Sequence, residues 1–417
     1  MALIPFIYFT IWLTAHLKNS NVRFGVGAMS LLWIDIDSFF SFLLDIRDLY
    51  GDWGCNDYAL SLGRVILYCL LWTLILYPLT KLDNKEIQLS IQKQQLFHYL
   101  CIFSIVCGAL YVVGTGIFNN IIANLQVDRS DAYENSMDQY NNAYAGKKQI
   151  LLWVPMVITR FWPLLLLFWF VAISICQQSV WVRWGLLVLS MYLMFSGFAG
   201  GGRAQTLWWI VTFMEYYCLF YPFIAKRKRT VILLTFLGIA CIGILGFFAI
   251  TLSRFDSSTR YALDSIIGYA GQPLNNFCAI IPYVDFAHLY SERLFPLSNF
   301  LIANNLYNMM DYYAFLGNIY PLQVNVFFTL FGELLLDTGV AGLLLFTILY
   351  YVVLFKLSFL KNKNLEFSQL LILSIIICIP VRGIFAWPFL GDLKETLGLF
   401  YVLMLYALFK YTFKLKI

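Results

Sequence analysis

The chain has 417 residues, of which 61% are hydrophobic and 12% are charged, and its formal net charge is +5. A soluble domain is nearer half apolar and a quarter charged, so this composition excludes an ordinary soluble globular protein. It indicates an all-α polytopic membrane protein, a class in which the spanning helix is the structural unit.

Apolar runs long enough to cross a hydrocarbon core of ~30 Å at ~1.5 Å per residue predict a single transmembrane domain over residues 1–417. About eleven spans are expected, near residues 1–17, 24–44, 59–79, 97–115, 151–175, 183–199, 204–224, 230–252, 326–355, 367–385 and 394–412. Two long polar segments, residues 116–150 and 253–325, are expected outside. The second is too long for a structureless loop, so we expect short interfacial helices there, with Tyr261 to Tyr283 dipping into the membrane.

The distribution of basic residues sets the orientation of such a chain. With eleven spans, the tetrad from Lys226 to Arg229, the pair Lys361 and Lys363, and the C-terminal lysines all fall on one side, which we assign to the cytoplasm. The opposite side and the adjoining helix ends hold nine arginines: Arg47, Arg64, Arg129, Arg160, Arg203, Arg254, Arg260, Arg293 and Arg382. Arginine grips phosphate or carboxylate with two parallel bonds, whereas lysine is a hydrated point charge. As a set, these arginines favour a site for an anionic ligand, although each one could instead pair with the abundant external carboxylates.

A glycine-rich turn lies between two central spans, where residues 196–205 read SGFAGGGRAQ. Three consecutive glycines, Gly200 to Gly202, allow the backbone to turn tightly and to approach a ligand. Arg203 then begins the next helix, whose free N–H groups and dipole favour an anion. We interpret this hairpin as an anion-binding turn, with a purely structural turn as the alternative.

A second cluster occurs where a span enters the long external segment. Arg254 and Arg260 alternate there with Asp256 and Asp264, which is compatible with phosphate binding or with an ion-pair cluster that orders the segment. Two further arginines near the outer ends of spans are candidates for the same pocket: Arg160 and Arg382.

A third constellation lies in residues 326–342, VFFTLFGELLLDTGVAG. Glu333 and Asp337 are four residues apart and therefore share one helix face, where two like charges destabilise an isolated helix. An external cation or substrate hydroxyls should then compensate. The two carboxylates are interpreted as acid/base groups or as partners of Arg203 or Arg254.

Other ionisable residues carry weaker signals. Asp35 and Asp37 are interpreted as partners of external arginines, and His288 as a surface residue of the long segment. The histidines show no zinc spacing, and no nucleotide-binding or Ser-His-Asp motif is present. We therefore expect no metal, no cofactor and no nucleic-acid partner.

At SGFAGGGRAQTLWW and FTLFGELLLDTGVAGLLLF the chain resembles the bacterial oligosaccharide repeat-unit polymerases, the O-antigen polymerase family. The shared features are the glycine-rich turn with Arg203, the long external segment, and the helix start that carries Glu333, Asp337 and Gly339. The resemblance implies a GT-C-like, metal-independent membrane glycosyltransferase at the external face of the cytoplasmic membrane. Its reaction would join undecaprenyl-diphosphate-linked repeat units into a surface polysaccharide, O-antigen or capsule.

The resemblance also implies roles for particular residues. The donor diphosphate would be held by three arginines: Arg203, Arg254 and Arg260. The acceptor hydroxyl would be deprotonated by one of three carboxylates: Asp264, Glu333 or Asp337. The implied partners are the lipid bilayer, the lipid-linked oligosaccharides and a chain-length regulator protein. The alternatives are a flippase of lipid-linked oligosaccharide and an O-antigen ligase, for which His288 is a poor match to the external histidine of that family.

Overall fold

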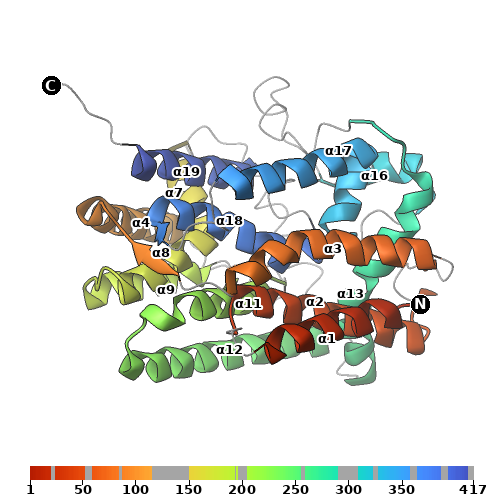
Figure 1. The fold of residues 1–417 in the computed structure, drawn as a ribbon, viewed down its shortest axis with the longest axis horizontal. Coiled ribbons are helices and arrows are strands. Elements are labelled where there is room, and N and C mark those ends of the chain that lie inside the picture. The colour runs from red at the N-terminus through yellow and green to blue at the C-terminus, as the bar shows by residue number, and fades with distance from the viewer. Residues whose placement is uncertain are drawn as a thin grey trace. The chain divides into compact units, whose positions relative to one another are not determined.

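The computed structural model describes residues 1–19, 24–51, 59–83, 87–114, 150–192, 194–195, 204–254, 259–289, 309–322, 327–356, 364–386 and 393–411 (Figure 1). Within these ranges the fold is helical apart from two three-residue strands. Five of the helices in this part of the chain, α2, α3, α4, α12 and α17, are long and apolar enough to cross a membrane. The all-α architecture of a membrane protein is thus present.

A helix lies in each range where the sequence predicts a span. These helices are α1 (Leu3–Lys18), α2 (Val26–Ile46), α3 (Leu62–Asp83), α4 (Gln94–Gly114), α7 (Ile150–Arg160), α8 (Trp162–Ser174), α9 (Val180–Ser190), α11 (Ala204–Phe220), α12 (Lys226–Arg254), α17 (Thr329–Lys356), α18 (Phe367–Gly383) and α19 (Leu393–Lys410). The range 151–175 holds two of them, α7 and α8, because the backbone leaves the helical conformation at Phe161 (φ −86°, ψ 54°). Pro163 follows in the first turn of α8, where a missing N–H costs nothing.

The two expected external segments have different outcomes. Residues 116–149 lie outside the described part of the chain. The described part of residues 253–325 contains α13 (Thr259–Ile280), the 3₁₀ turn η4 (Ile281–Tyr283) and α16 (Met309–Ile319). The described part of this segment is therefore largely helical, and its position outside or at the membrane surface stays a prediction.

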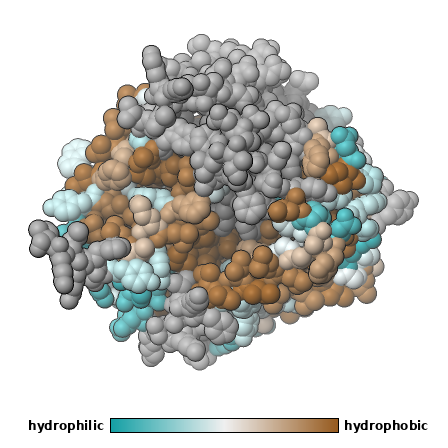
Figure 2. All heavy atoms as spheres, turned by 90° about the horizontal axis from the view of Figure 1, so that it is seen from above, coloured by the Kyte–Doolittle hydropathy of each residue, from teal (hydrophilic) through white to brown (hydrophobic). Residues whose placement is uncertain are grey.

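Large apolar side chains lie on the surface of the helices, and Figure 2 shows hydrophobic residues over much of the visible face. On α12 these exposed residues include Val231, Leu234, Leu237, Ile242, Leu245 and Phe248. On the second half of α17 they include Leu344, Leu345, Ile348 and Leu349. Apolar surface of this extent is unfavourable in water and is matched by lipid chains.

The chain divides into two compact units that interleave along the sequence. The first unit comprises Met1–Ile87, Arg260–Lys363 and Ile376–Thr396, and the second comprises Gln88–Thr259, Asn364–Ile375 and Leu397–Ile417. Neither unit is a continuous stretch of chain, so each can be completed only by segments that are distant in sequence.

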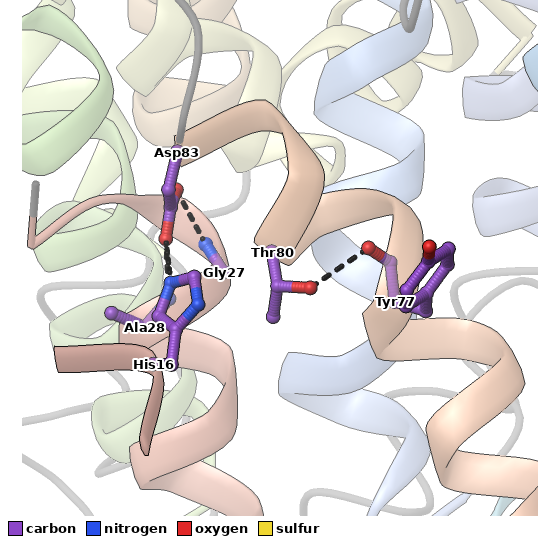
Figure 3. A network of polar contacts seen from close by, with 6 residues as sticks. All are labelled: His16, Gly27, Ala28, Tyr77, Thr80 and Asp83. Carbon is purple, nitrogen blue, oxygen red and sulfur yellow. Dashed lines mark hydrogen bonds and ion pairs between the residues drawn. The ribbon is translucent and has the colours of Figure 1, made fainter. Parts of the chain in front are cut away.

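In the first unit, α1, α2 and α3 pack side by side and meet at a buried carboxylate (Figure 3). Asp83, at the end of α3, accepts the backbone N–H groups of Gly27 (3.0 Å) and Ala28 (2.8 Å) in the first turn of α2. His16, near the end of α1, lies 3.1 Å from the same carboxylate. Asp83 thereby satisfies N–H groups that a helix start leaves without intrahelical partners.

In the same unit, α13 packs closely against the last turns of α2 and the first turns of α3. The Ser41 hydroxyl donates to the carbonyl of Gly271 (2.9 Å), where a Cβ would lie 2.6 Å from the Phe40 carbonyl oxygen. Arg64 donates to the carbonyl of Cys278 (3.3 Å). These contacts lie near one end of α2 and α3, which is compatible with a helix that dips into a membrane from one side.

In the second unit, two strands tie the starts of two helices together. Strand β1 (Gln88–Ser90) pairs in parallel with β2 (Asn364–Glu366), directly before α4 and α18 respectively. Lys93 donates to the carbonyls of Leu408 (2.6 Å) and Tyr411 (2.9 Å) at the end of α19, where a cation complements the helix dipole. The starts of α4 and α18 and the end of α19 therefore lie together, as their predicted common side requires.

Candidate functional site

The element that carries the candidate site is α17, which is two helices joined at Gly339. The backbone there has φ 69° and ψ −166°, a conformation that favours glycine. A Cβ at this position would also lie 2.6 Å from the carbonyl oxygen of Asp285. Gly339 is therefore required twice, by the local backbone and by a neighbouring segment.

The neighbouring segment, residues 285–288, follows α13 and η4 and crosses the break; we call it the clasp. The N–H of Val340 reaches the Asp285 carbonyl (3.4 Å), and the N–H of Ala341 reaches the Phe286 carbonyl (2.8 Å). In a continuous helix these N–H groups would bond carbonyls four residues earlier. The break thus exchanges two helical hydrogen bonds for two bonds to the clasp.

Because the Val340 N–H bonds the clasp, the carbonyl of Leu336 has a different hydrogen-bond partner than in a continuous helix. Nε2 of His288 lies 2.9 Å from the carbonyl oxygen of Leu336, and the hydroxyl of Tyr320 lies 3.4 Å from the same nitrogen. Because a carbonyl oxygen can only accept, Nε2 of His288 carries the proton in this contact. His288 therefore takes the place of the N–H that Val340 would supply in a continuous helix.

The first half of α17 is anchored at its other end as well. The side-chain amide of Asn276 on α13 donates to the Phe327 carbonyl (2.9 Å). The N–H of Gly332 lies 3.3 Å from the Thr329 hydroxyl oxygen, which accepts from it as a helix-capping residue does. The half-helix is consequently held by side chains at its start and by the clasp at its end.

Glu333 and Asp337 both lie on this short half-helix, and both are buried, with 4% and 2% of their surface exposed. The sequence correctly places them on one helical segment. Both carboxylates have interaction partners in the structure. Ionisable residues buried in a membrane protein are costly and usually functional, so this half-helix is the strongest candidate site in the first unit.

The end of α18 packs beside the start of the half-helix. A Cβ on Gly383 would lie 2.6 Å from a side-chain carbon of Leu330, one turn before Glu333. The indole N–H of Trp33 donates to the Val381 carbonyl (3.0 Å). Arg382 lies between Val381 and Gly383 in sequence and is half-buried, so its backbone lies beside the start of the half-helix that carries the carboxylates.

Asp264, the third candidate carboxylate, is in a different environment. It forms an ion pair with Arg47 at 2.7 Å, and the two side chains are 15% and 33% exposed. Arg260 lies one turn earlier on α13 and is exposed. The arginine–aspartate cluster that the sequence predicts here therefore includes Arg47, from the end of α2, as the partner of Asp264.

The remaining predicted arginines cannot be placed in this site. Arg203 and its glycine turn lie outside the described residues. Arg160 ends α7 and Arg254 ends α12, but the described part of the chain does not include their side chains. Their roles remain predictions from the sequence.

Two interpretations from the sequence are wrong in their details. Asp35 accepts a hydrogen bond from Thr10 (2.8 Å) and Asp37 accepts one from Tyr68 (3.2 Å), where arginine partners were expected. These donors come from neighbouring helices, and sequence spacing cannot identify them. His288 is half-buried and bonds the α17 backbone, where a surface residue was expected.

The buried polar residues of α13 were not among the site residues predicted from the sequence. Gln272, Asn275 and Asn276 are all at most 3% exposed, and the run GQPLNN within an apolar stretch is the signal that could have identified them. The contacts of Asp285 and Phe286 left no such signal, because these two residues act through their backbone carbonyls. Within the described residues, no group of three or more His, Cys, Asp or Glu side chains could hold a metal ion.

Comparison with known proteins does not assign the chain to a family. No protein-family model matches the chain, and no curated protein or solved structure is significantly similar to it.

Proposed function

We propose that the protein is a membrane-embedded glycosyltransferase that polymerises undecaprenyl-diphosphate-linked oligosaccharide repeat units into a surface polysaccharide. In this proposal the chain has about eleven spans with a GT-C-like arrangement. It lies in the cytoplasmic membrane with its site facing the exterior. The proposal rests on the sequence motifs, and one structural observation supports it: the motif carboxylates Glu333 and Asp337 are buried on a half-helix that ends at a clasped break.

The chemistry requires a base for the acceptor hydroxyl and positive charge for the departing diphosphate. Glu333 and Asp337 are the candidates for the base, because Asp264 already holds Arg47 in an ion pair. Arg382 lies beside the start of the half-helix and is a candidate for contact with the diphosphate. From the sequence alone, Arg160, Arg203, Arg254 and Arg260 are proposed as further contacts for the diphosphate.

The proposal is tested by reconstituting the purified protein in vesicles with lipid-linked repeat units and measuring polymer length. The wild-type protein should convert single units into polymer. Glu333→Gln, Asp337→Asn and Arg203→Ala should each lower the rate by about 100-fold or more, because they remove the base or the diphosphate contact. Glu366→Gln is the matched control, since its carboxylate is 39% exposed and pairs only loosely with Lys410 at 3.5 Å. Single units left unchanged by active, folded protein would contradict the proposal.

A second candidate, a flippase of lipid-linked oligosaccharide, is favoured by the break at Gly339. Discontinuous helices with polar groups beside the break are a recurrent feature of transporters. A flippase would move single units across the vesicle membrane without changing their length. Measuring the sidedness of the units together with their length therefore separates the two functions.

A further inference from the structure

The clasp joins the long segment after α13 to the backbone that carries Asp337. Three hydrogen bonds make this junction: Val340 and Ala341 donate to the clasp carbonyls, and His288 donates to Leu336. Leu336 immediately precedes Asp337, so the histidine bond fixes the peptide unit next to the buried carboxylate.

The bond from His288 is the only side-chain contribution among these three. Substitutions in the clasp leave the carbonyl acceptors of Asp285 and Phe286 in the chain, whereas the bond to Leu336 depends directly on the side chain at position 288. The hydroxyl of Thr338 adds a local bond to the Leu334 carbonyl (2.6 Å), which stiffens the same turn from the other side. The orientation of Asp337 therefore depends on position 288 more than on any other residue of the clasp.

We propose that His288 is a positioning residue for Asp337, acting by donating its Nε2 proton to the Leu336 carbonyl. This inference rests on the proposed polymerase function, because it assigns the chemistry to Asp337. His288 itself has no role in proton transfer to the substrate. Loss of its bond lets the last turn of the half-helix relax, and a displacement of about 1 Å at a catalytic group costs on the order of 100-fold in rate.

Glutamine and asparagine provide a matched pair of substitutions. The side-chain amide nitrogen of glutamine overlaps Nε2 of histidine and can still donate to Leu336, whereas that of asparagine is too short to reach it. Neither residue is an acid or a base near neutral pH. His288→Gln therefore keeps the positioning bond without any proton-transfer capacity, and His288→Asn removes both.

The experiment measures polymerisation kinetics in vesicles together with hydrogen–deuterium exchange of the amides of Val340 and Ala341. We expect His288→Gln to retain kcat within about threefold. His288→Asn should lower kcat by about 100-fold with KM within about twofold, and should speed exchange at both amides. His98→Gln is the control, because this histidine lies in the second unit, where its ring nitrogen is hydrogen-bonded to Gln178, and the substitution should change neither readout.

The outcomes separate the two proposals. Equal loss of kcat in the Gln and Asn variants would overturn the positioning role and assign proton transfer to His288. Full activity and unchanged exchange in His288→Asn would overturn the inference outright. Inactive but folded wild-type protein would overturn the polymerase function and with it the catalytic consequence. In that case, faster amide exchange in His288→Asn but not in His288→Gln would still show that the His288 bond stabilises the structure around the break.

Discussion

Tyr351 donates its hydroxyl proton to the backbone carbonyl of Leu74 across 2.7 Å. This carbonyl lacks its helical partner because the residue four positions later is Pro78, which has no N–H. Tyr350 donates to the next carbonyl, that of Ile75, at 2.9 Å. An unsatisfied carbonyl is costly in an apolar medium, so Tyr351 compensates for the proline in α3, and the two tyrosines together hold α17 beside α3.

This relationship predicts the result of a double-mutant cycle. Tyr351→Phe should lower the free energy of unfolding in detergent by about 1 kcal/mol, because it removes one hydrogen bond. In a Pro78→Ala background the cost should be smaller, since the new N–H can satisfy the Leu74 carbonyl. Equal costs in the two backgrounds would contradict the compensation.

The break in α17 predicts a large difference between two glycine substitutions. Gly339→Ala should destabilise the protein by at least ~1–2 kcal/mol, because a Cβ is unfavourable at positive φ and would also contact the clasp. Gly63→Ala in α3 is the control, because a Cβ there meets nothing within 4 Å. Thermal unfolding midpoints check the prediction, and similar shifts for both variants would count against the described break.

The buried junction at Asp83 predicts a stronger effect than a surface ion pair. Asp83→Ala should cost about 3 kcal/mol, because it leaves two N–H groups of α2 and the His16 ring without their acceptor. Glu366→Ala should cost no more than ~1 kcal/mol, because its pair with Lys410 is solvent-exposed. Chemical denaturation in detergent compares the two variants. Similar costs would mean that Asp83 is not the acceptor on which the junction depends.

The Arg47–Asp264 pair predicts a modest coupling between two partly exposed side chains. A cycle of Arg47→Ala and Asp264→Ala should give an interaction energy of at most ~1 kcal/mol in unfolding. Polymerisation by Asp264→Asn should fall only severalfold, far less than in Asp337→Asn. If Asp264→Asn lowered the polymerisation rate as much as Asp337→Asn, Asp264 would again be a candidate for the catalytic base.

The positions of the helices follow from hydropathy, because a helix must be apolar along its length to be buried in lipid or packed against other helices. The break at Gly339 could not be read in this way. Asp337, Thr338 and Gly339 interrupt the apolar run there, but such residues also occur in continuous helices, and the break itself is a backbone conformation that hydropathy does not report. The break at Phe161 had a local signal in the following Pro163, although a continuous span was predicted there.

The part of the candidate site that could be predicted is the part formed by residues close together in sequence. Glu333 and Asp337 are four residues apart on one helix, and the structure buries both. The partners of Asp264, Asp35 and Asp37 come from other helices, and only tertiary packing brings them near. His288 illustrates the same limit, because its acceptor is a carbonyl that exists as a free group only once α17 is broken.

The pairing of β1 with β2 has a consequence for how the protein is made. Gln88 pairs with Asn364, so the strand before α4 has no partner until most of the chain has been synthesised. At roughly 5–20 residues per second, that interval lasts on the order of tens of seconds. During this time the early helices of the second unit are in the membrane while β1, which precedes α4, has no strand to pair with. A chaperone or the insertion machinery that shields residues 87–93 during this interval would therefore affect the yield of folded protein without touching its stability.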